Sequence, residues 1–234
     1  MKKGLVISID GPAGSGKSTI AKKLAKMIGY KYINTGEIYR YLTYFALQKN
    51  MDIKNANLMT VLSKKFADDY LKESQKEKQC EIFCKNNSNL LNKIHTPEVD
   101  KNVSLLAQHE FVRYNLIPIQ RMLSEKGSVI MEGRDIGTVV LPNADIKIYL
   151  SADTKTRIFR RYKELRKKGY NVKYKNIKRE MMKRDYIDSK RKYAPLKVPK
   201  NAYIIDTSNK DIEEIIRIIF KIVSLKEKDI YENS

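Results

Sequence analysis

Cysteine and histidine are scarce in this sequence, with two of each among 234 residues. Cys80 and Cys84 share one short segment, and His95 and His109 are the only histidines. A structural zinc site takes about four Cys or His ligands at close spacing, and a disulfide framework takes more cysteines than these. We therefore expect two reduced thiols and no metal site built from cysteine or histidine.

Long apolar runs are missing as well. No window approaches the roughly 18 consecutive apolar residues of a membrane-spanning helix, so we expect no membrane partner. The N-terminal apolar run is too short for a signal peptide, and it meets Asp10 and Gly11 instead of a small-residue cleavage site. From these two absences we expect a cytoplasmic protein.

Acidic residues are few: 27 Asp and Glu stand against 47 Lys and Arg, which gives a formal net charge of +20. Such an excess is typical of nucleic-acid-binding proteins. The lysines, however, are spread along the whole chain, and a general compositional bias gives the same charge. The arginines gather in residues 113–134, 157–166 and 179–191. Because the planar guanidinium suits phosphate groups, these clusters indicate anionic ligands.

Short apolar segments alternate with helical patterns along the chain. Five segments rich in β-branched residues are expected to form strands: Leu5–Ile9, Lys31–Ile33, Ser128–Met131, Ile146–Leu150 and Ala202–Asp206. They are apolar on both faces, as is typical of a buried parallel sheet. Residues 17–28 have one apolar stripe that Gly29 can end, and residues 212–223 have a stronger stripe with Asp211 near its start. The alternation predicts a doubly wound α/β sheet.

Residues 11–18, GPAGSGKS, fit the pattern G-x-x-x-x-G-K-[ST] and lie between a predicted strand and a predicted helix. Glycines let backbone N–H groups converge on one point, and the helix N-terminus adds partial positive charge there. Lys17 would reach the β- and γ-phosphates, and the Ser18 hydroxyl would bind the Mg²⁺ of the nucleotide. A glycine-rich turn without a ligand is the alternative. We predict an ATP site, a P-loop, made of Gly11, Pro12, Ala13, Gly14, Ser15, Gly16, Lys17, Ser18 and Thr19.

Three further stretches follow predicted strands or hold clustered arginines. They are INTGEIYR at 33–40, EGRDIGT at 132–138 and RDYIDSKRKYAPL at 184–196. In an open α/β sheet, ligands bind outside the carboxyl ends of the strands, so the first two stretches are expected at the same edge as the P-loop. Each arginine alone would suit a solvated surface. Together they favour a second anionic ligand beside the triphosphate.

With these stretches the chain resembles the bacterial cytidylate kinases of the type 1 subfamily, which phosphorylate CMP and dCMP with ATP. The resemblance covers nearly the whole chain, through DGPAGSGKST, TGEIYR, EGRDIGTVV, RRYKEL, RDYIDSKRKYAPL and the terminal IDTS. It implies a P-loop NTPase fold: three α/β/α layers, a five-stranded parallel sheet, a monophosphate-binding insertion and a helical lid. It also implies a monomer. Asn34 departs from the family, which has an acidic residue at that position.

The expected organisation is one P-loop kinase domain over residues 1–234. Its core comprises residues 1–51, 111–152 and 169–225. The monophosphate-binding insertion covers about 52–110 and is expected to contain a small hairpin or strand pair around the two cysteines. The lid covers about 153–168, where basic residues could close over the phosphates or simply face solvent. A frayed tail, 226–234, is expected at the end.

The resemblance also implies roles for individual residues. The implied catalytic residues are Lys17, Arg134, Arg157 and Arg161. The implied CMP-binding residues are Thr35, Arg40, Ser104, Arg113, Arg134, Asp135, Arg184, Asp188 and Arg191. In this set Arg40, Arg134 and Arg191 would hold the acceptor phosphate, while Ser104, Arg113 and Asp135 would contact the cytosine edge and Arg184 and Asp188 the ribose. The chemistry is compatible, because a carboxylate can accept from the exocyclic amino group of cytosine.

Other functions share some of these features. A kinase for UMP, AMP or a non-nucleotide would carry the same P-loop. A nucleic-acid-binding ATPase would account for the charge, although the sequence has no RNA-binding aromatic motif and no helicase-like motif set. A regulatory P-loop protein would bind ATP without phosphotransfer. The resemblance favours a kinase for CMP or dCMP that requires no nucleic acid.

Overall fold

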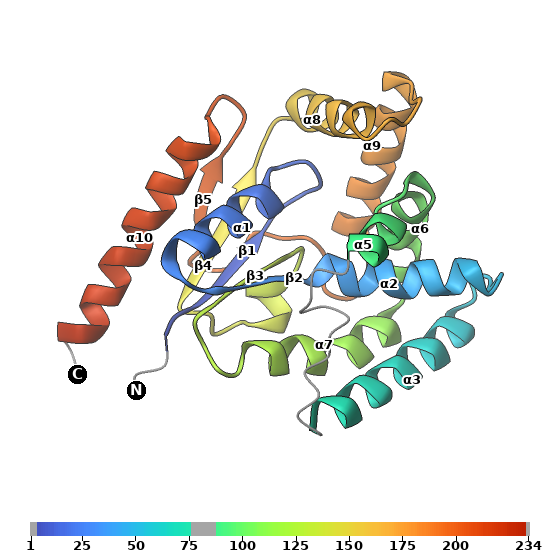
Figure 1. The fold of residues 1–234 in the computed structure, drawn as a ribbon, viewed down its shortest axis with the longest axis horizontal. Coiled ribbons are helices and arrows are strands. Elements are labelled where there is room, and N and C mark those ends of the chain that lie inside the picture. The colour runs from blue at the N-terminus through green and yellow to red at the C-terminus, as the bar shows by residue number, and fades with distance from the viewer. Residues whose placement is uncertain (1–3, 76–87, 233–234) are drawn as a thin grey trace. The chain divides into compact units, whose positions relative to one another are not determined.

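The computed structural model describes residues 4–75 and 88–232, and Figure 1 draws their helices and strands as a ribbon. The chain divides into two compact units. We call the first the sheet unit; it comprises Met1–Ile33, Ser124–Lys190 and Ala194–Ser234. We call the second the helical unit; it comprises Asn34–Leu123 and Arg191–Tyr193. The predicted grouping of the chain into one domain with an insertion and a lid stays a prediction.

The sheet unit is built on a five-stranded sheet in the order β2-β3-β1-β4-β5. The strands are β1 (Val6–Asp10), β2 (Lys31–Asn34), β3 (Val129–Gly133), β4 (Ile146–Ser151) and β5 (Tyr203–Asp206). β1 pairs in parallel with β3 and β4, and β4 pairs in parallel with β5. Each observed strand lies within about two residues of its predicted segment, as sequence patterning allows. The expected P-loop α/β fold with a five-stranded sheet is confirmed.

Helices α1 (Lys17–Ile28) and α10 (Ile212–Glu232) pack with the sheet in one hydrophobic cluster. Ile7 of β1, Leu24 of α1 and Ile219 of α10 are fully buried members of this cluster. The helical pattern read from residues 17–28 is confirmed at both ends. Gly29 ends α1 in the left-handed conformation, with φ of 71°, and its N–H donates to a carbonyl of the last helical turn.

The C-terminal segment differs from the expected frayed tail, residues 226–234, because α10 continues as far as Glu232. One reason is a tertiary contact that the local sequence does not predict. Tyr30 donates its hydroxyl hydrogen to Glu227 Oε1 at 2.9 Å. This hydrogen bond attaches the last turns of α10 to the segment that precedes β2.

The rest of the sheet unit consists of three helical segments. A short π-helix, η1 (Ile136–Val140), follows β3. Helices α8 (Thr154–Lys167) and α9 (Tyr174–Lys190) follow β4 and share a small apolar cluster that includes Ile158, Leu165 and Ile177. The segment expected to form a helical lid is therefore helical, and a second helix packs against it.

The helical unit contains α2 (Thr35–Gln48), α3 (Ala56–Gln75), α5 (Ser88–Ile94), α6 (Pro97–Ala107) and α7 (Glu110–Ser124). Its own hydrophobic cluster includes Ile38, Leu106 and Leu116, all buried. The hairpin predicted around Cys80 and Cys84 lies outside the described residues. Within residues 4–75 and 88–232, no helix combines the length and the apolar character needed to cross a bilayer.

Candidate active site

Four strands of the sheet unit end at one edge of the sheet. Asp10, the last residue of β1, lies opposite Gly133 of β3 and Tyr149 of β4. Ser151, the last residue of β4, lies opposite Asp206 of β5. The segments that follow these strands therefore start side by side. They hold the P-loop, Arg134 and Asp135 of the EGRDIGT stretch, the N-terminus of α8 and Thr207. This is the edge at which open α/β sheets bind ligands.

The P-loop passes close to its neighbours at two glycines. Gly11 has φ of 150°, and a Cβ there would lie 2.1 Å from the carbonyl oxygen of Leu150. Gly14 has φ of 75°, and a Cβ there would lie 2.8 Å from the carbonyl oxygen of Arg157. Any larger side chain would push the loop away from β4 and α8.

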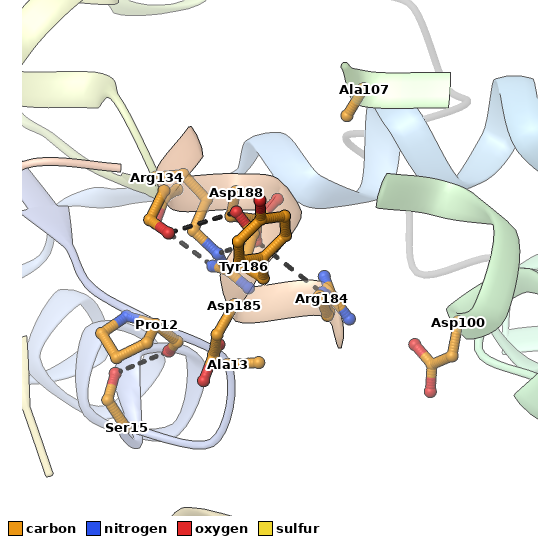
Figure 2. A network of polar contacts seen from close by, with 12 residues as sticks. Pro12, Ala13, Ser15, Asp100, Ala107, Arg134, Arg184, Asp185, Tyr186 and Asp188 are labelled. Atoms are coloured by element: carbon orange, nitrogen blue, oxygen red, sulfur yellow. Dashed lines mark hydrogen bonds and ion pairs between the residues drawn. The ribbon is translucent and has the colours of Figure 1, made fainter. Parts of the chain in front are cut away.

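The lysine of the P-loop forms a hydrogen bond within the loop itself. Lys17 Nζ donates to the carbonyl oxygen of Pro12 at 2.7 Å, and Ser15 Oγ donates to the same oxygen at 3.0 Å, as Figure 2 shows for the second bond. The lysine side chain is buried. Burial lowers the pKa of Lys17 well below its usual value, and the positive charge of Arg134 lowers it further. A phosphate group beside Lys17 would oppose both effects, because an anion stabilises the protonated amine.

Arg157 is the basic residue of α8 that contacts the P-loop directly. Its Nη1 atom donates to the carbonyl oxygen of Ala13 at 3.1 Å and pairs with Asp185 Oδ2 at 2.6 Å. The side chain is buried. The structure thus places Arg157 against the P-loop, and its guanidinium also links α8 to α9. Arg161, on the next turn, pairs with Glu164 at 2.5 Å.

A second charged cluster follows β3. Arg134 Nε donates to Asp188 Oδ2 at 3.1 Å, and Arg184 Nε lies 3.9 Å from the same carboxylate oxygen. Figure 2 shows the three side chains converging. Asp188 is buried, and these two guanidinium groups help to compensate its charge. The structure therefore brings together three residues that the sequence assigned to CMP.

Asp10, the last residue of β1, forms hydrogen bonds with the backbone that follows Asp135. Its two carboxylate oxygens accept from the N–H groups of Ile136 and Gly137, each at 2.7 Å. These amides open η1 immediately after Asp135, which is buried. Burial raises the pKa of Asp10 to about 6 from an ordinary 3.8, although the two amides act in the opposite direction.

This raised pKa predicts a specific pH dependence of stability. Between about pH 4 and pH 6 the folded state holds a proton on Asp10 that the unfolded state has released. The contribution of Asp10 to the free energy of unfolding therefore falls as pH rises through this window, by about 3 kcal/mol in total. Urea unfolding of wild type and Asp10→Asn at several pH values measures it, since the asparagine cannot titrate. A stability difference that stays constant from pH 4 to 6.5 would contradict the assignment.

In the helical unit, Arg40 is held at the end of α5 and the start of α6. Its Nη1 atom donates to the carbonyl oxygen of Ile94 at 3.2 Å, and Nη2 pairs with Asp100. The arginine is buried, which fixes its fork in one orientation. Asp100 had no role in the sequence prediction, and together with the Ile94 carbonyl it orients this arginine.

Arg113 and Ser104 belong to neighbouring helices of the same unit. Arg113 is almost fully buried, donates to the carbonyl oxygen of Ala107 at 3.3 Å, and lies 5.1 Å from the centre of the Tyr39 ring. Ser104 is also buried, and its hydroxyl has no hydrogen-bond partner within the part of the chain that the structure describes. A buried hydroxyl of this kind is suited to donate to a ligand.

The departure at Asn34 has a structural explanation. Asn34 is the N-cap of α2, and its Oδ1 atom accepts from the N–H of Gly36 at 3.0 Å. Its Nδ2 group donates to Glu37 Oε1 at 3.2 Å. An amide oxygen caps a helix as well as a carboxylate does, so α2 and the buried Thr35 at its start keep their places.

The predicted site residues are distributed over both units. The sheet unit holds the P-loop together with Arg134, Asp135, Arg157, Arg161, Arg184 and Asp188. The helical unit holds Thr35, Arg40, Ser104, Arg113 and Arg191, the last of them buried. Three residues that the sequence prediction left without a role also contact this set: Asp100, Asp185 and Thr207. A fourth, Asp10, bonds the backbone directly after Asp135. For Asp10 a signal existed, because an acidic residue ends an otherwise apolar strand.

Comparison with known proteins adds an independent finding. Residues 7–225 match the family model described as cytidylate kinase. A cytidylate kinase of Clostridium tetani is 46% identical over 231 residues, covering 96% of this chain and 97% of that protein. One of Bacillus cytotoxicus is 43% identical over 225 residues, covering 96% and 98%. Among solved structures, a shikimate kinase from Acinetobacter baumannii covers 94% of each chain at 15% identity and a TM-score of 0.44, a likeness too weak to bear on function.

Proposed function

Because this chain belongs to the cytidylate kinase family, we propose that it transfers the γ-phosphoryl group of ATP to CMP or dCMP, which yields CDP or dCDP and ADP. The attacking phosphate oxygen is already anionic, so the reaction needs no strong general base. Positioning of the two phosphates and neutralisation of their charge supply most of the catalysis. The observation that carries the proposal is the buried Lys17, folded over the P-loop of a chain from this family.

The donor side of the reaction uses the P-loop, Lys17 and the arginines of α8. The loop amides and the N-terminus of α1 would hold the triphosphate. Lys17 would exchange the Pro12 carbonyl for phosphate oxygens. Arg157 and Arg161 would stabilise the transferring group and keep water out, which matters because ATP hydrolysis is the competing reaction. Their ion pairs with Asp185 and Glu164 would then rearrange.

The acceptor side uses three arginines for the phosphate of CMP, namely Arg40, Arg134 and Arg191. Support comes from the burial of Arg40 and Arg191 and from the fixed fork of Arg40. Arg184 and Asp188 would bind the ribose, and Thr35 would contact the nucleotide from the start of α2. A planar guanidinium binds two phosphate oxygens at once, which orients the attacking oxygen as well as neutralising it.

For the base, we propose that Asp135 accepts a hydrogen bond from the 4-amino group of cytosine. Ser104 and Arg113 would donate to its N3 and O2 acceptors. All three side chains are buried, so their hydrogen bonds to the base would be shielded from water. Uracil presents a carbonyl at position 4, which would face the carboxylate of Asp135 and remain an unpaired acceptor.

Replacing Asp135 with alanine is therefore expected to reduce the preference for CMP over UMP. Loss of one discriminating hydrogen bond predicts about a tenfold fall in the ratio of kcat/KM for the two acceptors. Steady-state kinetics with both acceptors measure this ratio. Asp68→Ala, which removes an exposed carboxylate from α3, is the control and should leave the ratio unchanged. An unchanged ratio in Asp135→Ala would contradict the base-reading role.

Mg²⁺ is the cofactor that we propose, carried to the site by ATP. Ser18 is exposed on the first turn of α1, beside Lys17, so its hydroxyl is accessible to a metal held mainly by phosphate oxygens and water. When bound, the ion would neutralise phosphate charge. The described residues contain no group of three or more acidic, histidine or cysteine side chains able to hold a metal.

A panel of acceptors tests the proposed function. ADP release from ATP is measured with CMP, dCMP, UMP, AMP and a non-nucleotide alcohol, and with RNA in place of an acceptor. CMP and dCMP should give the highest kcat/KM. A higher value for UMP or AMP would assign another kinase specificity, and ATP turnover stimulated by RNA alone would indicate a nucleic-acid-dependent ATPase.

The setting of the reaction is also proposed from the family resemblance. We propose a monomer that acts in the cytoplasm, in pyrimidine nucleotide metabolism, without a nucleic acid or membrane partner. Light scattering after size-exclusion chromatography measures the oligomeric state, for which a mass near 27.3 kDa is expected.

A further inference from the structure

Thr207 connects the end of β5 to the P-loop. It directly follows the last strand residue and is fully buried. Its Oγ1 atom donates to the carbonyl oxygen of Ser15 at 3.1 Å, across 192 positions of the sequence. Its own N–H donates to the carbonyl oxygen of Ser151 at 2.9 Å. The hydroxyl is thus carried by a backbone that is itself fixed to β4.

Arg160 of α8 fixes the direction of this hydroxyl. Its Nη1 atom donates to Thr207 Oγ1 at 2.9 Å, and its Nη2 atom donates to the Thr207 carbonyl oxygen at 2.5 Å. A threonine hydroxyl has a single hydrogen. Because Arg160 occupies a lone pair of the oxygen, the hydrogen is left for the Ser15 carbonyl. The guanidinium of Arg160 therefore acts on the loop through Thr207.

The bond to Ser15 orients one amide of the P-loop. In a planar trans peptide, the carbonyl of Ser15 and the N–H of Gly16 point in opposite directions. No cis peptide bond occurs within the described ranges, so this geometry holds for the loop. Thr207 holds the carbonyl on one side and thereby directs the Gly16 N–H to the other. In P-loops such N–H groups bind the phosphates.

We propose that Thr207 and Arg160 are positioning residues for ATP, which act by aiming the Gly16 amide at the phosphates. The inference rests on the proposed function only in taking ATP as the ligand of the P-loop. Arg157, by contrast, bonds the loop directly at Ala13 and is assigned to the transferring group. Arg157 and Arg160 of α8 thus have separate roles. Arg157 is assigned to the transferring phosphoryl group, and Arg160 orients the P-loop through Thr207.

Thr207→Val and Thr207→Ser test the inference, because valine keeps the shape and removes the hydroxyl whereas serine keeps the hydroxyl. Loss of the bond predicts that KM for ATP rises about tenfold in Thr207→Val, while KM for CMP stays within about twofold. Thr207→Ser should restore KM for ATP to within about threefold of wild type. Thr60→Val, which removes only a hydroxyl bonded within α3, is the control and should leave both KM values unchanged.

Calorimetric titration measures the Kd for ATP of the same variants with no acceptor present. It therefore tests Thr207 even if CMP is not the acceptor. Arg160→Met provides a second variant in case valine prevents folding. It should also weaken ATP binding, and the double variant with Thr207→Val should be no weaker than Thr207→Val alone, since both act through one bond. ATP binding within twofold of wild type in Thr207→Val, or equal loss in Thr207→Ser, would overturn the inference.

Discussion

Replacing Lys17 with methionine is expected to lower kcat by about a thousandfold. Lys17 is the buried amine at the P-loop, and its bond to the Pro12 carbonyl places it at the start of α1, where the phosphates are proposed to bind. Methionine fills a similar volume without a charge, so the transferring phosphoryl group would lose the neutralisation that Lys17 supplies.

The fold is expected to survive this change. Burial opposes the charged form of Lys17, as its lowered pKa indicates, so removing the charge relieves a desolvation cost. The melting temperature of Lys17→Met should therefore equal or exceed that of wild type. Lys22→Met removes an exposed lysine from the same helix and is the matched control, expected to keep its full rate. A rate within tenfold of wild type in Lys17→Met would refute the role of this residue.

The second large effect is expected at Arg134. Its guanidinium follows β3 directly and is held in place by Asp188 at 3.1 Å. Arg134→Met should lower kcat/KM for CMP by about a thousandfold, because both the charge and the planar fork are lost. Arg134→Lys keeps the charge only, and we expect a loss of about a hundredfold. KM for ATP should change little in either variant.

Steady-state kinetics with CMP varied at saturating ATP measure these losses. Arg217→Met, on the exposed side of α10, removes an arginine without a proposed role and should behave as wild type. Removing Arg134 also takes away the guanidinium that lies 3.1 Å from the buried Asp188, so a lower melting temperature is expected as well. If Arg134→Met keeps more than a tenth of kcat/KM for CMP, Arg134 does not serve the acceptor.

The local sequence determined the backbone of the sheet unit. Short apolar runs predicted all five strands, and β1 and β3 are buried along almost their whole length, as is typical of central strands in a parallel sheet. The expected burial of both faces is wrong for the outer strands β2 and β5, which are partly exposed because each has a neighbour on one side only. The end of α1 was equally readable, since Gly29 takes a left-handed conformation at little cost. The P-loop could also be predicted from the sequence. Its glycines, lysine and serine lie within eight consecutive residues, so its geometry depends on neighbours in the chain.

The partners of the charged side chains were decided by the tertiary structure. Asp10 meets the amides of Ile136 and Gly137 because β1 lies between β3 and β4 in the sheet. Thr207 meets Ser15 because β5 lies beside β4, and the last turns of α10 meet Tyr30 through Glu227. Hydrophobic periodicity gives the phase of a strand or helix, but it does not say which strands become neighbours. The order of the strands sets those distances, and with them the orientation of the side chains proposed to do the chemistry.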